Sequence, residues 1–510
     1  MLRHYPGKNY IVNGFKFGFD LGFKGVDKEI RCKNNATVRA NPVITREKIN
    51  SEIKLGRIAG PFPAAPFKNF RCSPLALRPK AIPGKYRLLH NLSHPYNEVD
   101  AVNDNIPDEL CKVKYDTIDS ALKILASRPS SYMAKSDISE AFRLIPLHPD
   151  SHKLTGFMFD EKYFYDKCLP MGASSSCKIF ESFSDALKYI LIAQYGLSNV
   201  IKVLDDFMFI ADSEEDCKDA LDFFRSLCSL VGVPISREKT VEPTRALVFL
   251  GYHIDLDKRV VSIPKEKILV YTEHVFEIMN MKRAKLRKIR SMIGQLSFVT
   301  NVIPGGRCFL RRLYDLTKGR INNNALIKIP KKAKLDLQMW ASFMKEYNGK
   351  AILAPRDVFS NDVLNFYSDS SLKGYGAYFG NKYVQGLFPK KWRHKDIQFL
   401  ELYPIYLMVE LFAHQLQHKA IIFVTDNKAV VGSINKQSSK NKNVMKLLRP
   451  MVLVLMKFDI TFEAVHIEGK KNIFCDALSR SQVPEELASN PEDWKRIPVP
   501  RHLMQSSLKA

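Results

Sequence analysis

The sequence predicts a multidomain chain of mixed α and β structure, and three observations support this prediction. At 510 residues the chain is too long for one hydrophobic core, so roughly three or more domains or subdomains are expected. Apolar residues make up 45% of the chain and aromatic residues 11%, which is enough for packed cores and excludes a disordered protein. Short apolar strands, such as those in Ile201–Ile210, alternate with longer helical stretches, such as the amphipathic one from Leu221.

The charge balance predicts a polyanionic partner. Lys and Arg number 78 against 53 Asp and Glu, and the net charge of +25 favours nucleic acid over a membrane surface. Nine cysteines without a CxxC pair indicate a reduced, intracellular protein of the cytoplasm or nucleus. The sequence shows no signal peptide and no apolar stretch long enough to span a bilayer, so no membrane partner is expected.

The strongest chemical signal is the adjacent pair Asp205 and Asp206 inside the segment Ile201–Ile210. The flanks are predicted to be two buried strands with the acids at the bend of a hairpin, and Lys202 is the other charged residue of the segment. Two carboxylates in apolar surroundings repel each other and lose hydration, so a bound cation would stabilise them. Mg²⁺ that joins carboxylates to phosphates is the commonest solution, and a solvent-facing Asp-Asp turn is the alternative.

Upstream segments supply further candidates. Tyr132–Ile138 is predicted to be a strand with Asp137 near its end, and Phe142 follows in a short turn or helix. Residues 70–95 predict two strands joined by a turn at Pro83-Gly84. Four cations lie on or beside that hairpin, namely Arg78, Lys80, Lys85 and Arg87. They suit either a charged edge strand or a flap that grips a triphosphate.

Three more features follow the strand of Asp137 along the chain. A Leu-Pro-Met-Gly break contains Met171 and Gly172 and precedes a helix that runs to about Gln194. Lys239 closes a loop, and Val248–Ile254 is predicted to be one apolar strand with a glycine at its centre. Further on, residues 282–290 hold six cations and lead into a helix, which suits either a solvated face or contact with phosphates.

A second set of acids lies in the last third of the chain. Asp369 is placed in a strand and Asp426 at the end of another, whereas Glu401 opens a predicted helix with Pro404 in its first turn. Asp476 follows ten residues after His466. Each acid alone would suit a helix cap or a surface charge, but the four together in this order predict a metal site.

These motifs, in this order, resemble the palm motifs of reverse transcriptases. The segments PLALRPK, GKYRLLHNLS and AVNDNIP resemble the DIRS-type, tyrosine-recombinase retroelements, and the later acids resemble a retroelement ribonuclease H (RNase H). The resemblance implies a right-hand polymerase with fingers, palm and thumb, followed by an RNase H-like α/β domain. The implied domains are an N-terminal extension (1–65), fingers and palm (66–260), thumb and connection (261–350), a linker (351–362), the RNase H-like domain (363–481) and a C-terminal tail (482–510).

The resemblance also implies residue roles and cofactors. Each site would use two Mg²⁺ ions, with Mn²⁺ as an alternative. The implied metal ligands and catalytic acids are Asp137, Asp205 and Asp206 in the polymerase, and Asp369, Glu401, Asp426 and Asp476 in the RNase H, with His466 as a catalytic proton shuttle. The implied substrate-binding residues are Lys80 and Arg87 for phosphates, Phe142 as a steric gate under the sugar, Met171, Gly172, and Lys239 for the pyrophosphate.

The function implied is an RNA- and DNA-directed DNA polymerase with RNase H activity, from a retrotransposon. Its partners would be an RNA template, a DNA primer, the RNA–DNA hybrid and deoxynucleoside triphosphates, with further polyprotein domains or subunits as additional partners. Two alternatives stay open: a catalytically silent or domesticated nucleic-acid-binding protein, and a pararetrovirus-like polymerase.

Overall fold

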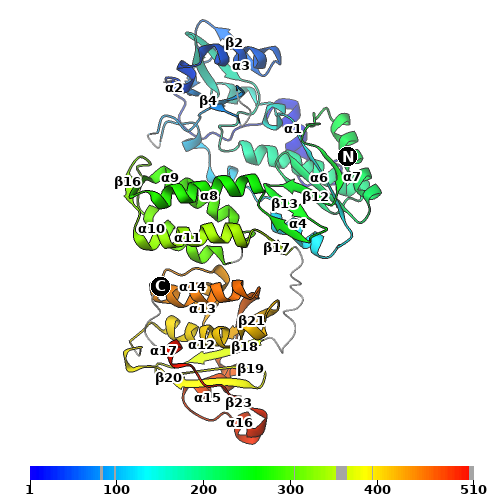
Figure 1. The fold of residues 1–510 in the computed structure, drawn as a ribbon. Helices are drawn as coiled ribbons and strands as arrows, with labels where there is room; N and C mark the ends of the chain where they lie inside the picture. Colours follow the sequence, from blue (N-terminus) through cyan, green and yellow to red (C-terminus); the bar gives the residue numbers. More distant parts are fainter. Residues whose placement is uncertain (81–83, 97–98, 304, 352–364, 393, 505–510) are drawn as a thin grey trace. The chain divides into compact units, whose positions relative to one another are not determined.

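The structure, a computed structural model, describes residues 1–80, 84–96, 99–303, 305–351, 365–392 and 394–504. It has mixed α and β structure throughout, as predicted, and divides into two compact units, Met1–Leu250 and Gly251–Ala510 (Figure 1). Pro83 of the predicted turn and nearly all of the predicted linker 351–362 lie outside the described residues. None of the described helices combines the length and apolar character needed to cross a membrane.

The first unit begins with a five-stranded sheet. Its strands, in spatial order, are β1 (Ile30–Arg31), β3 (Arg71–Cys72), β7 (Gly156–Phe159), β8 (Lys162–Asp166) and β2 (Ile58–Phe62). The predicted N-terminal extension therefore supplies two strands of this sheet, together with the helices α1 (Lys8–Phe17), α2 (Ala36–Arg39) and α3 (Pro42–Lys54). Beside it lies the predicted hairpin, formed by β4 (Leu75–Pro79) and β5 (Tyr86–His90) with Arg78 opposite Arg87.

The second sheet of this unit is four-stranded. In spatial order its strands are β11 (Val241–Thr244), β6 (Tyr132–Asp137), β10 (Asp206–Ala211) and β9 (Val200–Val203). Helices α6 (Ser176–Tyr195) and α7 (Glu214–Leu230) pack against it, and their apolar faces meet the buried side chains of β10. Phe224 of α7, for example, lies with its ring 4.6 Å from that of Phe207. Burial of this apolar surface fixes the sheet on which the first set of acids lies.

One predicted strand is wrong. Val248–Ile254 does not form a single strand but contributes to β12 (Ala246–Phe249) and β13 (Tyr252–Asp255). Leu250 and Gly251 between them have φ of 47° and 83°, respectively. Left-handed backbone cannot continue an extended strand, so the chain turns at these two residues.

The second unit contains a helical part and a larger sheet. The described helices before the linker are α8 (Lys265–Asn280), α9 (Leu286–Val299), α10 (Arg311–Thr317) and α11 (Lys331–Glu346). The basic segment 282–290 forms β15 (Arg283–Lys285), which pairs with β16 (Leu326–Lys328), and the first turn of α9. Strands β13 and β14 (Val260–Ser262) pair antiparallel, and β17 (Lys350–Ala351) pairs antiparallel with the other edge of β14.

The larger sheet is six-stranded. In spatial order its strands are β22 (Thr461–His466), β21 (Ala420–Thr425), β18 (Asn365–Ser370), β19 (Gly374–Phe379), β20 (Lys382–Leu387) and β23 (Lys495–Arg496). β18, β21 and β22 run parallel, whereas β19 is antiparallel to both of its neighbours. The predicted tail 482–510 supplies β23 and the helices α16 (Glu485–Ser489) and α17 (Arg501–Met504).

Helices cover both faces of this sheet. Figure 1 shows α12 (Ile397–Phe412), α13 (Lys428–Lys436) and α14 (Lys442–Lys457) on one side and α15 (Ile473–Ser479) on the other. The side chains of β19 explain this arrangement, since neighbours in a strand point to opposite faces. The ring of Tyr375 lies 5.2 Å from that of Tyr403 in α12, whereas a Cβ at Gly376 would lie 2.3 Å from Leu478 of α15. The glycine lets α15 approach the sheet closely.

Candidate active sites

The register of the four-stranded sheet brings the first set of acids together. Asp206 begins β10 and is the cross-strand partner of Asp137, the last residue of β6. Val203 and Asp206 pair across the β9–β10 hairpin, so Leu204 and Asp205 form its two-residue turn. The predicted hairpin is thus confirmed, and its two acids lie with Asp137 at one end of the sheet. Asp137 is buried, and the other two are half-buried.

Burial and neighbouring charges affect the two acids of the turn. Burial, together with the charges of Asp205 and Asp137, raises the pKa of Asp206 to about 6. Burial also raises the pKa of Asp205, and the charge of Asp137 adds to the rise. Lys239 lies with Nζ 2.8 Å from each carboxylate oxygen of Asp137. Partial burial disfavours the lysine's charge, but the hydrogen bond and charge of Asp137 raise the pKa of Lys239 overall. The cluster therefore attracts cations.

The predicted phosphate and sugar contacts lie in the same unit. Lys80 and Arg87 are exposed on the β4–β5 hairpin, where the backbone N–H of Lys80 donates to Lys85 O at 2.8 Å. The charge of Arg87 opposes the rise in the pKa of Asp205. Phe142 lies in the short helix η3 (Ala141–Leu144), partly buried, with its ring 5.4 Å from that of Phe180.

The Met171-Gly172 turn is held by a residue that the sequence analysis did not single out. Met171 is 44% exposed, whereas a Cβ at Gly172 would lie 1.7 Å from the carbonyl oxygen of His90. Asn103 Nδ2 donates to Gly172 O at 2.8 Å, and Asn103 Oδ1 accepts from Ser174 N at 2.8 Å. Asn103 belongs to the AVNDNIP segment. That segment was noted for its resemblance to a family, but nothing in the sequence indicated that its asparagine would hold the turn.

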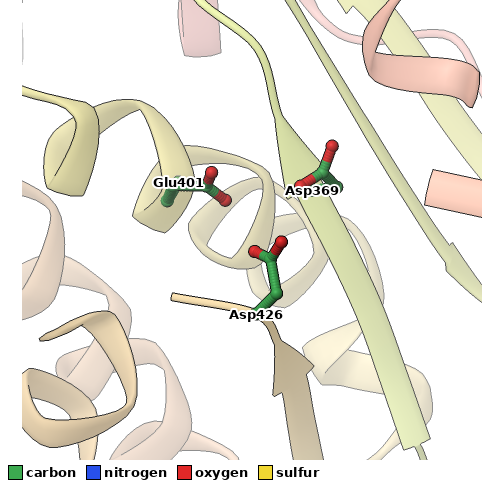
Figure 2. A group of neighbouring side chains, drawn as sticks. All are labelled: Asp369, Glu401 and Asp426. Carbon is green, nitrogen blue, oxygen red and sulfur yellow. The ribbon is translucent and has the colours of Figure 1, made fainter. Parts of the chain in front are cut away.

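The second set of acids forms a compact triad. Asp369 lies in β18, Glu401 in α12, and Asp426 directly after β21. Each offers a carboxylate oxygen within 4.8 Å of the others, and Figure 2 shows the three carboxylates converging on one space. Within the described ranges this is the one group of three or more His, Cys, Asp or Glu that meets this criterion, so the acids of the first set do not.

Burial dominates the electrostatics of the triad. Burial, with the charges of Asp369 and Asp426, raises the pKa of Glu401 to about 9. Burial likewise raises the pKa of Asp369, although a hydrogen bond from Ser479 opposes it. Glu401 Oε2 is buried and has no hydrogen-bond partner in the described part of the chain. An unpartnered carboxylate oxygen beside two further carboxylates fits a hard divalent cation such as Mg²⁺.

The remaining predicted residues lie next to the triad. Asp476 is in α15 outside the group of three, and Arg480 Nε donates to its carboxylate oxygens at 2.8 and 2.9 Å. Its charge still adds to the rise in the pKa of Asp369. His466, the last residue of β22, is exposed and pairs in register with Thr425, so it lies one strand from Asp426.

The predicted start of the helix at Glu401 is wrong. α12 begins before Glu401, and Pro404 lies in its interior rather than in its first turn. Because proline has no N–H, the carbonyl of Leu400 loses its helical partner. The hydroxyl of Ser370 donates to that carbonyl at 3.0 Å. Ser370 follows Asp369, and Leu400 precedes Glu401. The carbonyl that Pro404 leaves free thus accepts a bond that links the backbones on either side of these two acids.

Three carboxylates at one end of a four-stranded sheet are the arrangement expected from the sequence for a polymerase palm. Residues 78–254 match the family described as "Reverse transcriptase (RNA-dependent DNA polymerase)". Over these residues the chain is similar to the reverse transcriptase domain of retroviral and retroelement polyproteins.

Relatives and solved structures resemble this chain over most of its length. A "Putative enzymatic polyprotein" of Cassava vein mosaic virus is 24% identical over 72% of this chain and 55% of its own length. A "Genome polyprotein" of Petunia vein clearing virus is 24% identical over 74% of this chain, and the chain spans 16% of it. The foamy viral protease-reverse transcriptase in complex with RNA/DNA hybrid has a similar fold, with a TM-score of 0.54 and 17% identity over 88% of this chain and 56% of that one. The predicted fold class is confirmed.

Proposed function

We propose that this chain is an RNA- and DNA-directed DNA polymerase that also degrades the RNA strand of RNA–DNA hybrids. The observation that carries the proposal is the register of Asp137 with Asp206, with Asp205 in the turn between β9 and β10. It gathers three carboxylates at one end of a sheet inside the reverse transcriptase domain. The triad of the second unit supports the RNase H activity in the same way.

In the polymerase site, Asp137, Asp205 and Asp206 would hold two Mg²⁺ ions, with Mn²⁺ as an alternative. Bound Mg²⁺ lowers the pKa of the primer 3′-hydroxyl and stabilises charge on the leaving pyrophosphate. Lys239, now paired with Asp137, would turn its ammonium toward the pyrophosphate.

The surrounding residues would then select and hold the nucleotide. Arg87 binds phosphate oxygens through its fork and Lys80 acts as a point charge. Phe142 blocks a 2′-hydroxyl, while Met171 and Gly172 form the floor of the site. The exposed positions of Lys80 and Arg87 on the hairpin support these roles.

In the RNase H site, Asp369, Glu401, Asp426 and Asp476 would hold the metal ions. The unpartnered Oε2 of Glu401 supports a cation there. Arg480 would release Asp476 to join the triad, and exposed His466 would carry a proton between the site and solvent. The hybrid in the foamy viral structure supports an RNA–DNA hybrid as substrate.

For the origin of the chain we propose a retroelement, of the DIRS type by its upstream motifs. Because polyproteins of Cassava vein mosaic virus and Petunia vein clearing virus are among the relatives, a viral origin, as in a pararetrovirus-like polymerase, stays the alternative. Both origins share the chemistry above. The domain borders expected from the sequence belong to this proposal too, with fingers and palm at 66–260, thumb and connection at 261–350, and RNase H at 363–481.

The test is primer extension on RNA and DNA templates with Mg²⁺, alongside cleavage of a labelled RNA strand in a hybrid. We expect both activities, and EDTA should abolish both. Tight binding of hybrid without either activity would contradict the proposal and favour a silent or domesticated protein.

A further inference from the structure

A buried charge pair lies against the Leu204-Asp205 turn, which carries two acids of the proposed polymerase site. The side chain of Lys202 in β9 is 2% exposed and that of Glu181 in α6 is 6% exposed. Lys202 Nζ donates to Glu181 Oε1 at 2.7 Å and to Ser184 Oγ at 3.0 Å. It also lies 2.8 Å from Oδ1 of Asp185, whose side chain is 56% exposed.

Glu181 also reaches the turn itself. Its second carboxylate oxygen, Oε2, accepts a hydrogen bond from the backbone N–H of Leu204 at 2.9 Å. Leu204 has φ of 54°, in the left-handed region that residues other than glycine seldom adopt. Asp205 follows it directly, and Asp206 opens β10. The carboxylate of Glu181 therefore fixes the one strained residue on which the placement of both acids depends.

Stability alone does not explain why charges are buried here. Removing two ions from water opposes folding, and a well-packed apolar pair at such positions is often equally stable or more stable. An apolar pair, however, cannot accept the N–H of Leu204. Lys202 pairs with one carboxylate oxygen of Glu181, and the other oxygen faces the turn.

We propose that Glu181, whose charge is paired with Lys202, is a positioning residue that sets the Leu204-Asp205 turn in the geometry required for metal binding and nucleotide addition. This inference rests on the proposed polymerase function. Neither residue touches substrate in the proposed mechanism. Their contribution is the placement of Asp205 and Asp206, and a shift of about 1 Å in such groups can cost around a hundredfold in rate.

Two double variants of the full chain separate the acceptor from the charges. Glu181→Gln with Lys202→Met removes both charges but keeps an oxygen that can accept from Leu204. Glu181→Leu with Lys202→Met removes both charges and the acceptor. The readouts are the single-turnover rate of primer extension, the Mg²⁺ concentration for half-maximal rate, the Kd for primer–template and the unfolding temperature. Asp185→Asn, which loses a partner of Lys202 but no contact to the turn, is the matched control.

We expect the Gln/Met variant and Asp185→Asn to extend primers within a few-fold of wild type. The Leu/Met variant should be slower by about tenfold or more and should need more Mg²⁺, with an unchanged Kd for primer–template. Equal rates and equal Mg²⁺ dependence of the two double variants would overturn the inference. So would failure of either to fold, because the pair would then serve the palm as a whole. A wild-type chain that extends no primer would instead contradict the proposed function.

Discussion

The two acid clusters of this chain differ in how they balance their negative charge. In the four-stranded sheet of the first unit, the proposed palm, Lys239 lies against Asp137, and the charge of Arg87 acts on Asp205. In the second unit, the triad has an unpartnered oxygen at Glu401, whose pKa is about 9, against about 6 for Asp206 in the palm. The palm thus carries its own counter-charge, whereas the triad needs a proton or a metal ion. We expect the triad to depend more strongly on metal for its stability.

The largest expected effect concerns the palm acids. Asp205→Asn should lower primer extension on RNA and DNA templates by about a thousandfold, because loss of a metal ligand removes several kcal/mol of transition-state stabilisation. Hybrid affinity should stay nearly unchanged, since the cationic surface is intact, and cleavage of the RNA strand should persist. Extension within about tenfold of wild type would remove Asp205 from the metal site.

The reciprocal change in the triad should have a similar effect on the other activity. Asp426→Asn should stop cleavage of the RNA strand and leave DNA synthesis within a few-fold of wild type, measured on the same hybrid. Each set of acids offers enough ligands for its own metal site when phosphate and water complete the shell. Loss of both activities in a folded Asp426→Asn protein would mean that one composite site replaces the two.

Nucleic-acid binding should affect both sites together. Replacing Arg283, Arg287 and Arg290 by Gln should lower the slope of log Kd for hybrid against log salt concentration by about two to three. Each phosphate contact contributes roughly 0.7–0.9 to that slope. Both activities should fall in parallel at higher salt, because the enzyme binds less hybrid. An unchanged slope would assign the basic segment to a solvated face.

A change at the proposed gate should affect the palm alone. Phe142→Ala should raise the incorporation of ribonucleotides relative to deoxyribonucleotides by about tenfold or more, since it opens space at the sugar 2′ position. Single-nucleotide incorporation with each substrate measures the ratio, and RNA cleavage serves as the internal control. An unaltered ratio in a folded protein would rule out Phe142 as the gate.

The smallest expected effect tests the charge balance directly. A carboxyl group with a raised pKa in the folded state stabilises the fold at low pH and loses that contribution as the pH rises through the folded pKa. Without metal, the loss at Glu401 should continue up to about pH 9, whereas the loss at Asp206 should be complete soon above pH 6. Between pH 7 and 9, Glu401→Gln should therefore gain a few degrees in Tm relative to wild type.

The matched palm variant, Asp206→Asn, should keep a constant Tm difference from wild type over the same pH range. Added Mg²⁺ should stabilise wild type and should have less effect on Glu401→Gln, which lacks a ligand charge. Scanning calorimetry with EDTA or Mg²⁺ measures both effects. Parallel Tm curves for wild type and Glu401→Gln would show that Glu401 does not titrate in this range.

The acids could be singled out from the sequence because each lies at the end of an apolar strand or in an apolar helix, where a charge is conspicuous. The hairpin around Asp205 follows from its two apolar flanks alone. The supporting contacts could not be predicted, since Glu181 reaches Leu204 and Ser370 reaches Leu400 only through tertiary packing. The break at Leu250 was hidden for a different reason, because a left-handed residue inside an apolar run has no local signal other than the glycine that follows.

The close contact of Gly172 with the carbonyl of His90 has a consequence for mutational tolerance. Any side chain at position 172 would overlap a backbone oxygen of β5 that cannot move without the strand, so a saturation library should recover glycine almost alone there. Its neighbour Met171, exposed over nearly half its surface, should accept many residues. Two adjacent positions of one turn would thus differ in the variation they allow. Position 171 could vary with the substrate, whereas backbone contact restricts position 172 to glycine.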